Sequence, residues 1–157
     1  MAAMIILLGA VFAVNFRVSD LWIAQRERSQ IQQNFRFALD AITQEMRQAI
    51  TIGQPVENTF GETLEFTLQD PADAIKVDDV TYGMEADPAR SGASRITRTV
   101  AGTSTPVTES IPELAALYFI RSGNRVVMIA VARYKVFGTE QTMSYTTQTF
   151  TRISGTN

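Results

Sequence analysis

The residues best suited to chemistry are carboxylates in an acidic stretch near the middle of the chain. Residues 57–90 carry nine acidic side chains against two basic ones, Lys76 and Arg90. Carboxylate oxygens are the ligands that Ca²⁺ prefers. The candidate calcium ligands are Asp70, Asp73, Asp78 and Asp79. Their spacing does not match an EF-hand loop, so a solvated acidic loop is the alternative interpretation.

The chain lacks the groups on which most enzymes depend. Its 157 residues include no histidine and no cysteine. This composition removes the usual general base, the Ser-His arrangement, thiolate metal sites and disulfides. No pair of carboxylates is marked by its spacing for hydrolysis. We therefore expect that the protein is not an enzyme and holds no cofactor. The net charge of −2 also argues against a nucleic-acid partner, which would require a basic face.

The element that must position everything else lies at the N-terminus. Residues 1–16 carry no charge, and the only glycine before Gly53 is Gly9. A segment that is apolar on all sides is buried in lipid or in a protein core. We predict one continuous helix over Met1–Ile52, about 75 Å long at 1.5 Å per residue. Gly53 and Pro55 would end this helix.

The uncharged run is slightly short for a transmembrane helix, which needs about 20 apolar residues. It could be the end of a longer apolar segment or the core of a signal peptide. The second interpretation is disfavoured because no positively charged segment precedes the run and no cleavage site follows it. We predict that residues 1–16 lie in a membrane or a filament core. The apolar residues assigned to this role are Ile5, Leu7, Leu8, Val11, Phe12 and Val14.

The rest of the predicted helix, residues 17–52, is amphipathic. Its apolar residues recur at spacings of three and four, which places them on one face. We predict that this face packs on the C-terminal domain through Ile31, Phe35, Leu39, Ile42, Met46 and Ile50. Trp22 suits either a bilayer interface or packing against a neighbour. The helix arginines are either docking contacts or a solvated face.

The remainder, residues 53–157, reads as a β-rich head. Alternating or continuous apolar patterns bounded by turn residues predict a meander of antiparallel strands. The predicted strands are 64–68, 80–84, 96–100, 114–121, 125–137 and 142–153. Residues 122–124 suit a tight hairpin turn, and residues 87–92 and 101–106 suit loops. The predicted fold class is α+β, with a long N-terminal helix packed on an antiparallel β-sheet domain.

The segment QQNFRFALDAITQEMRQAI resembles the helix signature of type IV pilin-like proteins. The similarity is to minor pilins and minor pseudopilins of the PilW and PulJ kind. The matching residues are Gln33, Asn34, Arg36, Ala38, Leu39, Arg47 and Ala49. The order of RITRTV, an Ile-Pro-x-Leu segment, LYFI and RVVMIAVARYKVF is also similar, as is the closing TQTFTRISGTN. The resemblance covers most of the chain and is weak in residues 55–110.

The resemblance implies a pilin-like fold and a structural function. The protein would be a minor subunit of a type IV pilus or a type II secretion-like filament, contributing to filament initiation or to its tip. The helix would anchor it in the inner membrane before assembly, with the head in the periplasm or at the cell surface. Other pilin or pseudopilin subunits, the inner membrane and the assembly platform are the implied partners. The family's leader, Gly-Phe processing point and early Glu are not found here, so we expect them to precede Met1.

Two other functions remain open at the level of sequence. The helix could be the stalk of a membrane-anchored binding module, with the head as an adhesin or receptor. The chain could also be a membrane-tethered enzyme, which would require a polar cluster in a pocket. An upstream leader ending in Gly-Phe and followed by Glu would favour the pilin-like function over both.

Overall fold

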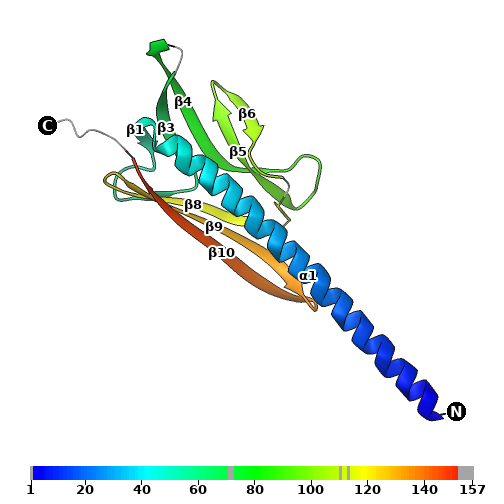
Figure 1. Cartoon of the computed structure of the whole chain (residues 1–157). Coiled ribbons are helices and arrows are strands. Elements are labelled where there is room, and N and C mark those ends of the chain that lie inside the picture. The colour runs from blue at the N-terminus through cyan, green and yellow to red at the C-terminus, as the bar shows by residue number, and fades with distance from the viewer. Residues whose placement is uncertain (1, 71–72, 110, 113, 152–157) are drawn as a thin grey trace.

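The protein consists of a long N-terminal helix and a head of antiparallel β-strands (Figure 1). The computed structural model describes residues 2–70, 73–109, 111–112 and 114–151, and it describes the backbone alone for residues 2–3, 5–6, 70, 73–77 and 112. The helix contacts the C-terminal strands β9 and β10. The predicted α+β class is therefore confirmed.

The helix α1 covers Ala2–Met46, which corresponds to about 68 Å at 1.5 Å per residue. The strands are β1 (Ala49–Gln54), β2 (Phe60–Gly61), β3 (Leu64–Asp70), β4 (Asp73–Ala86), β5 (Ala93–Val100), β6 (Thr103–Pro106), β7 (Ile111–Pro112), β8 (Leu114–Ser122), β9 (Arg125–Val136) and β10 (Thr139–Phe150). Each predicted strand overlaps an observed one. The end of the last predicted strand, residues 152–153, lies outside the described residues.

The helix ends at Met46, before the predicted end at Ile52. After Met46 the chain turns, and the Gln48 N–H donates to the Glu45 carbonyl at 2.9 Å. The following residues form β1, which pairs antiparallel with β3. This segment is rich in β-branched side chains, which favour a strand when a partner strand is present. The prediction that the helix continues to Ile52 and is ended by Gly53 and Pro55 is therefore wrong.

The earlier end of the helix changes the place of Ile50. The prediction put Ile50 on the apolar face of the helix, one turn after Met46. Instead it lies on β1, where its side chain is 42% exposed, whereas Ile52 is 7% exposed and belongs to the core. Regular alternation would place Ile50 and Ile52 on the same face of the strand, but the pairing of β1 with β3 has a register shift between Ala49 and Thr51, which breaks the alternation at Ile50. Ile50 therefore does not pack the helix on the head.

The head contains two sheets rather than one continuous meander. One is six-stranded with the order β1-β3-β4-β5-β6, and β7 pairs with β5. The other is four-stranded with the order β10-β9-β8-β2. The predicted loop over 101–106 contains β6, which follows a turn with positive φ at Ala101 and Gly102 (49° and 80°). Two consecutive positive φ values match the twist of the flanking strands and allow this short hairpin.

The core lies where the C-terminal half of α1 crosses the two sheets. The helix contributes Ile31, Phe35, Ala38, Leu39, Ile42 and Met46, all buried. From the six-stranded sheet come Phe66 and Tyr82, whose rings stack at a centroid distance of 6.0 Å. Phe119 and Met128 come from the four-stranded sheet. Five of the six residues predicted to join helix and head thus lie in one core cluster.

Candidate functional site

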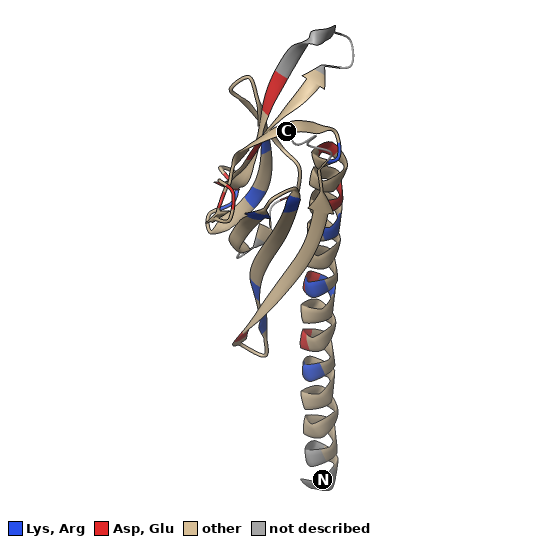
Figure 2. Cartoon of the chain, turned by 90° about the vertical axis from the view of Figure 1, so that its left-hand side faces the viewer, with Lys and Arg blue, Asp and Glu red and all other residues tan. Residues whose placement is uncertain are grey.

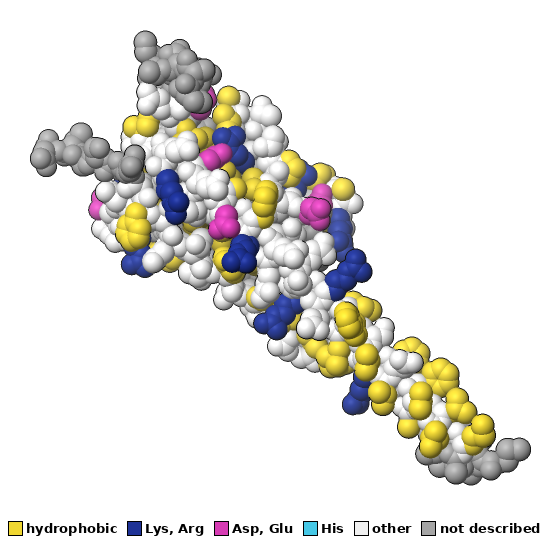
Figure 3. Space-filling model, in the orientation of Figure 1, with side chains coloured by type: hydrophobic (Ala, Val, Ile, Leu, Met, Phe, Trp, Pro, Cys, Tyr) yellow, Lys and Arg dark blue, Asp and Glu magenta, His cyan; other side chains and the backbone are white. Residues whose placement is uncertain are grey.

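The N-terminal half of α1 stands clear of the head. Every side chain that the structure describes from Met4 to Ile23 is exposed. The first buried one is Ala24, and regular packing begins at Ile31. Figure 3 shows hydrophobic side chains around this protruding part, and Figure 2 shows that charged residues begin well above the N-terminal end. We call this exposed part of α1, residues 4–23, the bare helix. It includes Arg17, the first charged residue, and continues for about two turns after it toward the head.

The side chains assigned to a membrane or filament core lie on this bare helix. Leu7, Leu8, Val11, Phe12 and Val14 are between 47% and 69% exposed. The side chain of Ile5 lies outside the described residues. Burying one such side chain contributes about 1.5–3 kcal/mol, so the whole set strongly favours an apolar environment. In the described part of the chain, α1 is long and apolar enough to cross a membrane.

Trp22 marks the junction between the bare and the covered helix. Its side chain is 72% exposed, so it does not pack against the head of its own chain. It lines a groove of about 750 Å³ together with polar helix residues and Glu109 from the segment between β6 and β7. The helix residues in this groove include Arg26 and Gln33. An amphipathic ring beside a polar groove is the arrangement expected near a membrane surface or a subunit contact.

A polar cluster fastens the end of α1 to the six-stranded sheet. The Arg98 Nε donates to both carboxylate oxygens of Glu45, at 2.9 and 3.0 Å. The Tyr82 hydroxyl donates to the Glu45 Oε2 at 3.0 Å. The side chains of Arg98 and Glu45 are 31% and 29% exposed, so solvent screens this ion pair only in part. One carboxylate of the helix is thus held by β4 and β5 together.

The same cluster shifts two proton equilibria. Burial raises the pKa of Tyr82 well above its usual range, and the charge and hydrogen bond of Glu45 raise it further. Burial alone would lower the pKa of Arg98, but the hydrogen bond and charge of Glu45 outweigh it and raise that pKa. At neutral pH the cluster therefore holds a neutral phenol and a charged guanidinium.

The raised pKa of Tyr82 leads to a prediction about alkaline stability. The fold favours the neutral phenol, so this contribution is fully present below about pH 10 and is lost as the pH rises above it. We expect the free energy of unfolding of the wild type to fall more steeply above pH 10 than that of Tyr82→Phe. Urea denaturation over an alkaline pH series measures both curves. Parallel curves would contradict a buried, Glu45-bound phenol.

The candidate calcium ligands do not form a described cluster. Asp78 and Asp79 are neighbours on β4 and therefore point to opposite faces of the sheet. Asp79 accepts a hydrogen bond from the Thr67 Oγ1 at 3.0 Å. The side chains of Asp70 and Asp73 lie outside the described residues. Among the side chains that the structure does describe, no group of three potential ligands could hold a metal ion.

Several exposed aromatic residues were not assigned a role from the sequence pattern, and three of them lie on α1 or at the β9–β10 turn. Phe16 and Phe37 on α1 are 71% and 68% exposed, and Phe137 at the β9–β10 turn is 54% exposed. Phe37 follows Phe35 by two positions, which on a helix places it on nearly the opposite side. This spacing from Phe35 is enough to predict from the sequence that Phe37 is exposed. No sequence signal singles out Phe137, because its neighbours in space, Arg17 and Asp20, come from the other end of the chain.

The arrangement is pilin-like, with a long apolar N-terminal helix packed on antiparallel sheets. No protein-family model, curated protein or solved structure matches the chain.

Proposed function

We propose that this chain is a structural subunit of a pilus-like or secretion-like filament, in the manner of a minor pilin or minor pseudopilin. The observation that carries the proposal is the continuity of α1. One unbroken helix is apolar on all sides at its free end and is built into the core of the head at its other end. Such an element suits a subunit that is first held in the inner membrane and later packed among other helices.

Physical chemistry supports both stages of this proposal. In the membrane, the exposed apolar side chains of residues 4–23 are solvated by lipid. After extraction from lipid they need another apolar surface, and the helices of neighbouring subunits offer one. Apolar burial contributes little to the difference between these two states, because lipid and packed helices are similarly apolar. Helix packing and specific polar pairs must therefore favour assembly.

The tight connection between helix and head supports a structural role. Phe35, Leu39 and Met46 are fully buried, and Glu45 is bound by Tyr82 and Arg98. A helix held in this way carries its head with it when it moves from membrane to filament. On this proposal the partners are other pilin-like subunits, the inner membrane and an assembly platform. The proposal assigns no catalysis to the chain.

Site-specific photo-cross-linking tests the proposal. A photoreactive phenylalanine derivative replaces Val11 on the bare helix, in cells that produce the filament. We expect covalent adducts with other pilin-like subunits, identified by mass spectrometry, and we expect them to disappear when the assembly ATPase is inactivated. We expect these adducts because position 11 would be surrounded by the apolar helices of neighbouring subunits in a filament core.

The matched control carries the same derivative at Thr103, an exposed position on β6 in the head. Adducts at Val11 that do not depend on assembly, or adducts with lipid alone, would count against a filament subunit. They would favour the alternative of a membrane-anchored binding module, in which the helix is a stalk that never leaves the bilayer.

A further inference from the structure

The turn between β9 and β10 has an unusual residue at its apex. Val136 pairs with Thr139, so Phe137 and Gly138 form a two-residue turn. Both have positive φ, 51° and 74°. Such turns favour Asn-Gly or Gly-Gly, because side chains with a Cβ are disfavoured at positive φ. A bulky aromatic residue at positive φ is uncommon and calls for an explanation.

Packing within the chain does not explain the choice of phenylalanine. The Phe137 side chain is 54% exposed. It lines an open cavity of about 530 Å³ together with Arg17 and Asp20 of α1. A smaller residue could make this turn with less strain and would leave less apolar surface in water. Conformational strain at an exposed position points to a role outside the isolated chain.

The position of the turn along α1 indicates what that role is. Arg17 and Asp20 are the first charged residues after the uncharged run, and Phe137 lies at their level. Figures 1 and 2 show the β9–β10 hairpin reaching down beside the helix to this level. If the uncharged run lies in a bilayer, its charged boundary lies at the headgroups. The hairpin tip then lies at the same depth as that boundary.

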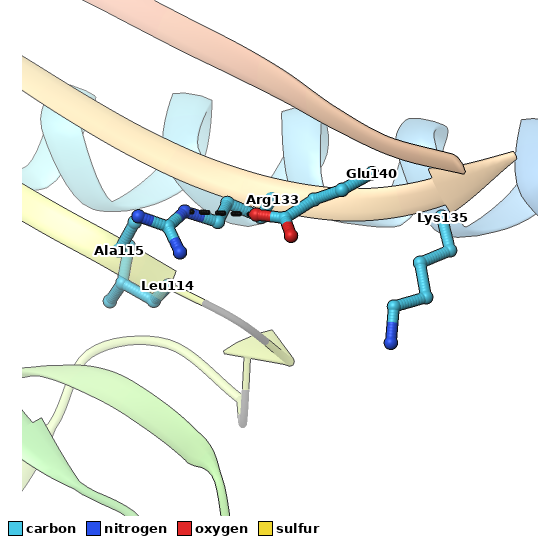
Figure 4. Close-up of a pocket in the computed structure, with 5 residues that line it drawn as sticks. All are labelled: Leu114, Ala115, Arg133, Lys135 and Glu140. Atoms are coloured by element: carbon cyan, nitrogen blue, oxygen red, sulfur yellow. Dashed lines mark ion pairs between the residues drawn. The ribbon is translucent and has the colours of Figure 1, made fainter. Parts of the chain in front are cut away.

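The charges around the tip fit a lipid surface. Arg17, Arg133 and Lys135 are cationic, and Asp20 and Glu140 are acidic. Figure 4 shows Arg133 paired with Glu140, at 3.2 Å between Nε and Oε1, while the Lys135 side chain extends from the end of β9. Long cationic side chains at a membrane boundary extend toward the headgroup phosphates. An aromatic ring flanked by lysine and arginine is typical of the interfacial layer.

We infer that the β9–β10 turn, with Phe137 at its apex, contacts the headgroup layer of the membrane when α1 is inserted. The hairpin and the helix then form two points of contact, which fix the orientation of the head relative to the bilayer. The inference rests on the membrane-inserted stage of the proposed function, and it names the lipid interface as the occupant of this surface.

Tryptophan fluorescence with brominated lipids tests the inference on the full chain. The sequence contains one tryptophan, Trp22, so the Trp22→Phe variant has no tryptophan fluorescence of its own. In that background Phe137→Trp reports on the turn. The protein is reconstituted at low density in vesicles of phosphatidylcholine and phosphatidylglycerol, with bromine near the headgroups or deep in the acyl chains. We expect Phe137→Trp to be quenched by shallow bromine to an extent similar to Trp22 in the wild type.

The matched control is Phe150→Trp in the same background. Phe150 is also an exposed aromatic residue, 63% exposed, at the opposite end of β10. The two positions are separated by about 40 Å of strand at 3.4 Å per residue. We expect Phe150→Trp to remain unquenched. A second variant, Phe137→Gly, should not lower the thermal midpoint of the head, because glycine accepts the positive φ without strain.

The outcomes separate this inference from the proposed function. If Trp22 is quenched and Phe137→Trp is not, the helix is inserted but the hairpin is off the membrane, and the inference is overturned. If neither is quenched, membrane insertion itself fails, and the proposed function falls with the inference. A large loss of stability in Phe137→Gly would show that Phe137 serves the fold, which would also overturn the inference.

Discussion

Phe35→Ala should lower the free energy of unfolding of the protein by about 3–5 kcal/mol, a large fraction of the stability of a small domain. Phe35 is fully buried in the core cluster between α1 and the sheets. Its removal costs the transfer free energy of the ring and leaves a cavity that the surrounding structure closes only in part. Urea denaturation of the full chain in mild detergent, followed by circular dichroism, measures the loss.

Phe37→Ala is the matched control for this prediction. Phe37 has the same side chain two positions later on the same helix, but it is 68% exposed. We expect a change within about 0.5 kcal/mol, the usual range for an exposed position. Equal losses in the two variants would mean that the helix does not present its Phe35 face to the head. The orientation of α1 described above would then be incorrect.

A charge in the bare helix should have the second large effect, this time on membrane insertion. Val11→Arg places a guanidinium in the uncharged run, where Val11 is 57% exposed. An arginine at the centre of a membrane helix costs about 2.5–3.5 kcal/mol on insertion scales. This corresponds to a shift of about two orders of magnitude in the insertion equilibrium. Alkaline extraction of membranes, followed by immunoblotting, measures the fraction that remains embedded.

Two controls accompany Val11→Arg. Gln30→Arg adds the same charge to an exposed position of the polar part of the helix and should not change extraction. Val11→Leu changes the side chain without adding charge and should also remain embedded. Retention of Val11→Arg in the membrane pellet to the same extent as Val11→Leu would exclude the uncharged run as the membrane anchor.

The apolar face of the helix can be predicted from the sequence because it depends on local spacing. Ile31, Phe35, Leu39, Ile42 and Met46 follow the helical period, and each is buried in the core. The strands were readable for a similar reason, since alternation and turn residues act over a few positions. Long segments with strong periodicity specify their own secondary structure, and tertiary contacts do not need to override it.

The C-terminal end of the helix cannot be predicted from local spacing in the same way. Ile50 continues the helical spacing after Met46, so the pattern alone extends the helix. Pairing of β1 with β3 decides otherwise, and the partner of Ala49 is Leu68, well along the chain. Backbone hydrogen bonds to a distant strand thus outweigh a helical spacing of moderate propensity. In the predicted loop at 101–106 the pairing is local: β6 folds back on the preceding strand β5 through the two-residue turn at Ala101 and Gly102.

The sequence pattern also does not predict the polar contacts between distant segments. The sequence pattern assigned no role to Glu45, which accepts hydrogen bonds from Tyr82 on β4 and Arg98 on β5. Phe137 reads as the end of a strand, and the register of the long β9–β10 hairpin carries it to Arg17. These neighbours follow from sheet geometry and not from local spacing.

The sequence by itself determined that this protein has an apolar N-terminal helix, an amphipathic continuation and a β-rich head. These properties arise from hydrophobic periodicity, which is local. The tertiary structure decided where the helix ends, which carboxylate fastens it to the head, and which aromatic residue lies beside the helix where its charges begin. Those features depend on strand pairing and register, which bring together residues from distant parts of the chain.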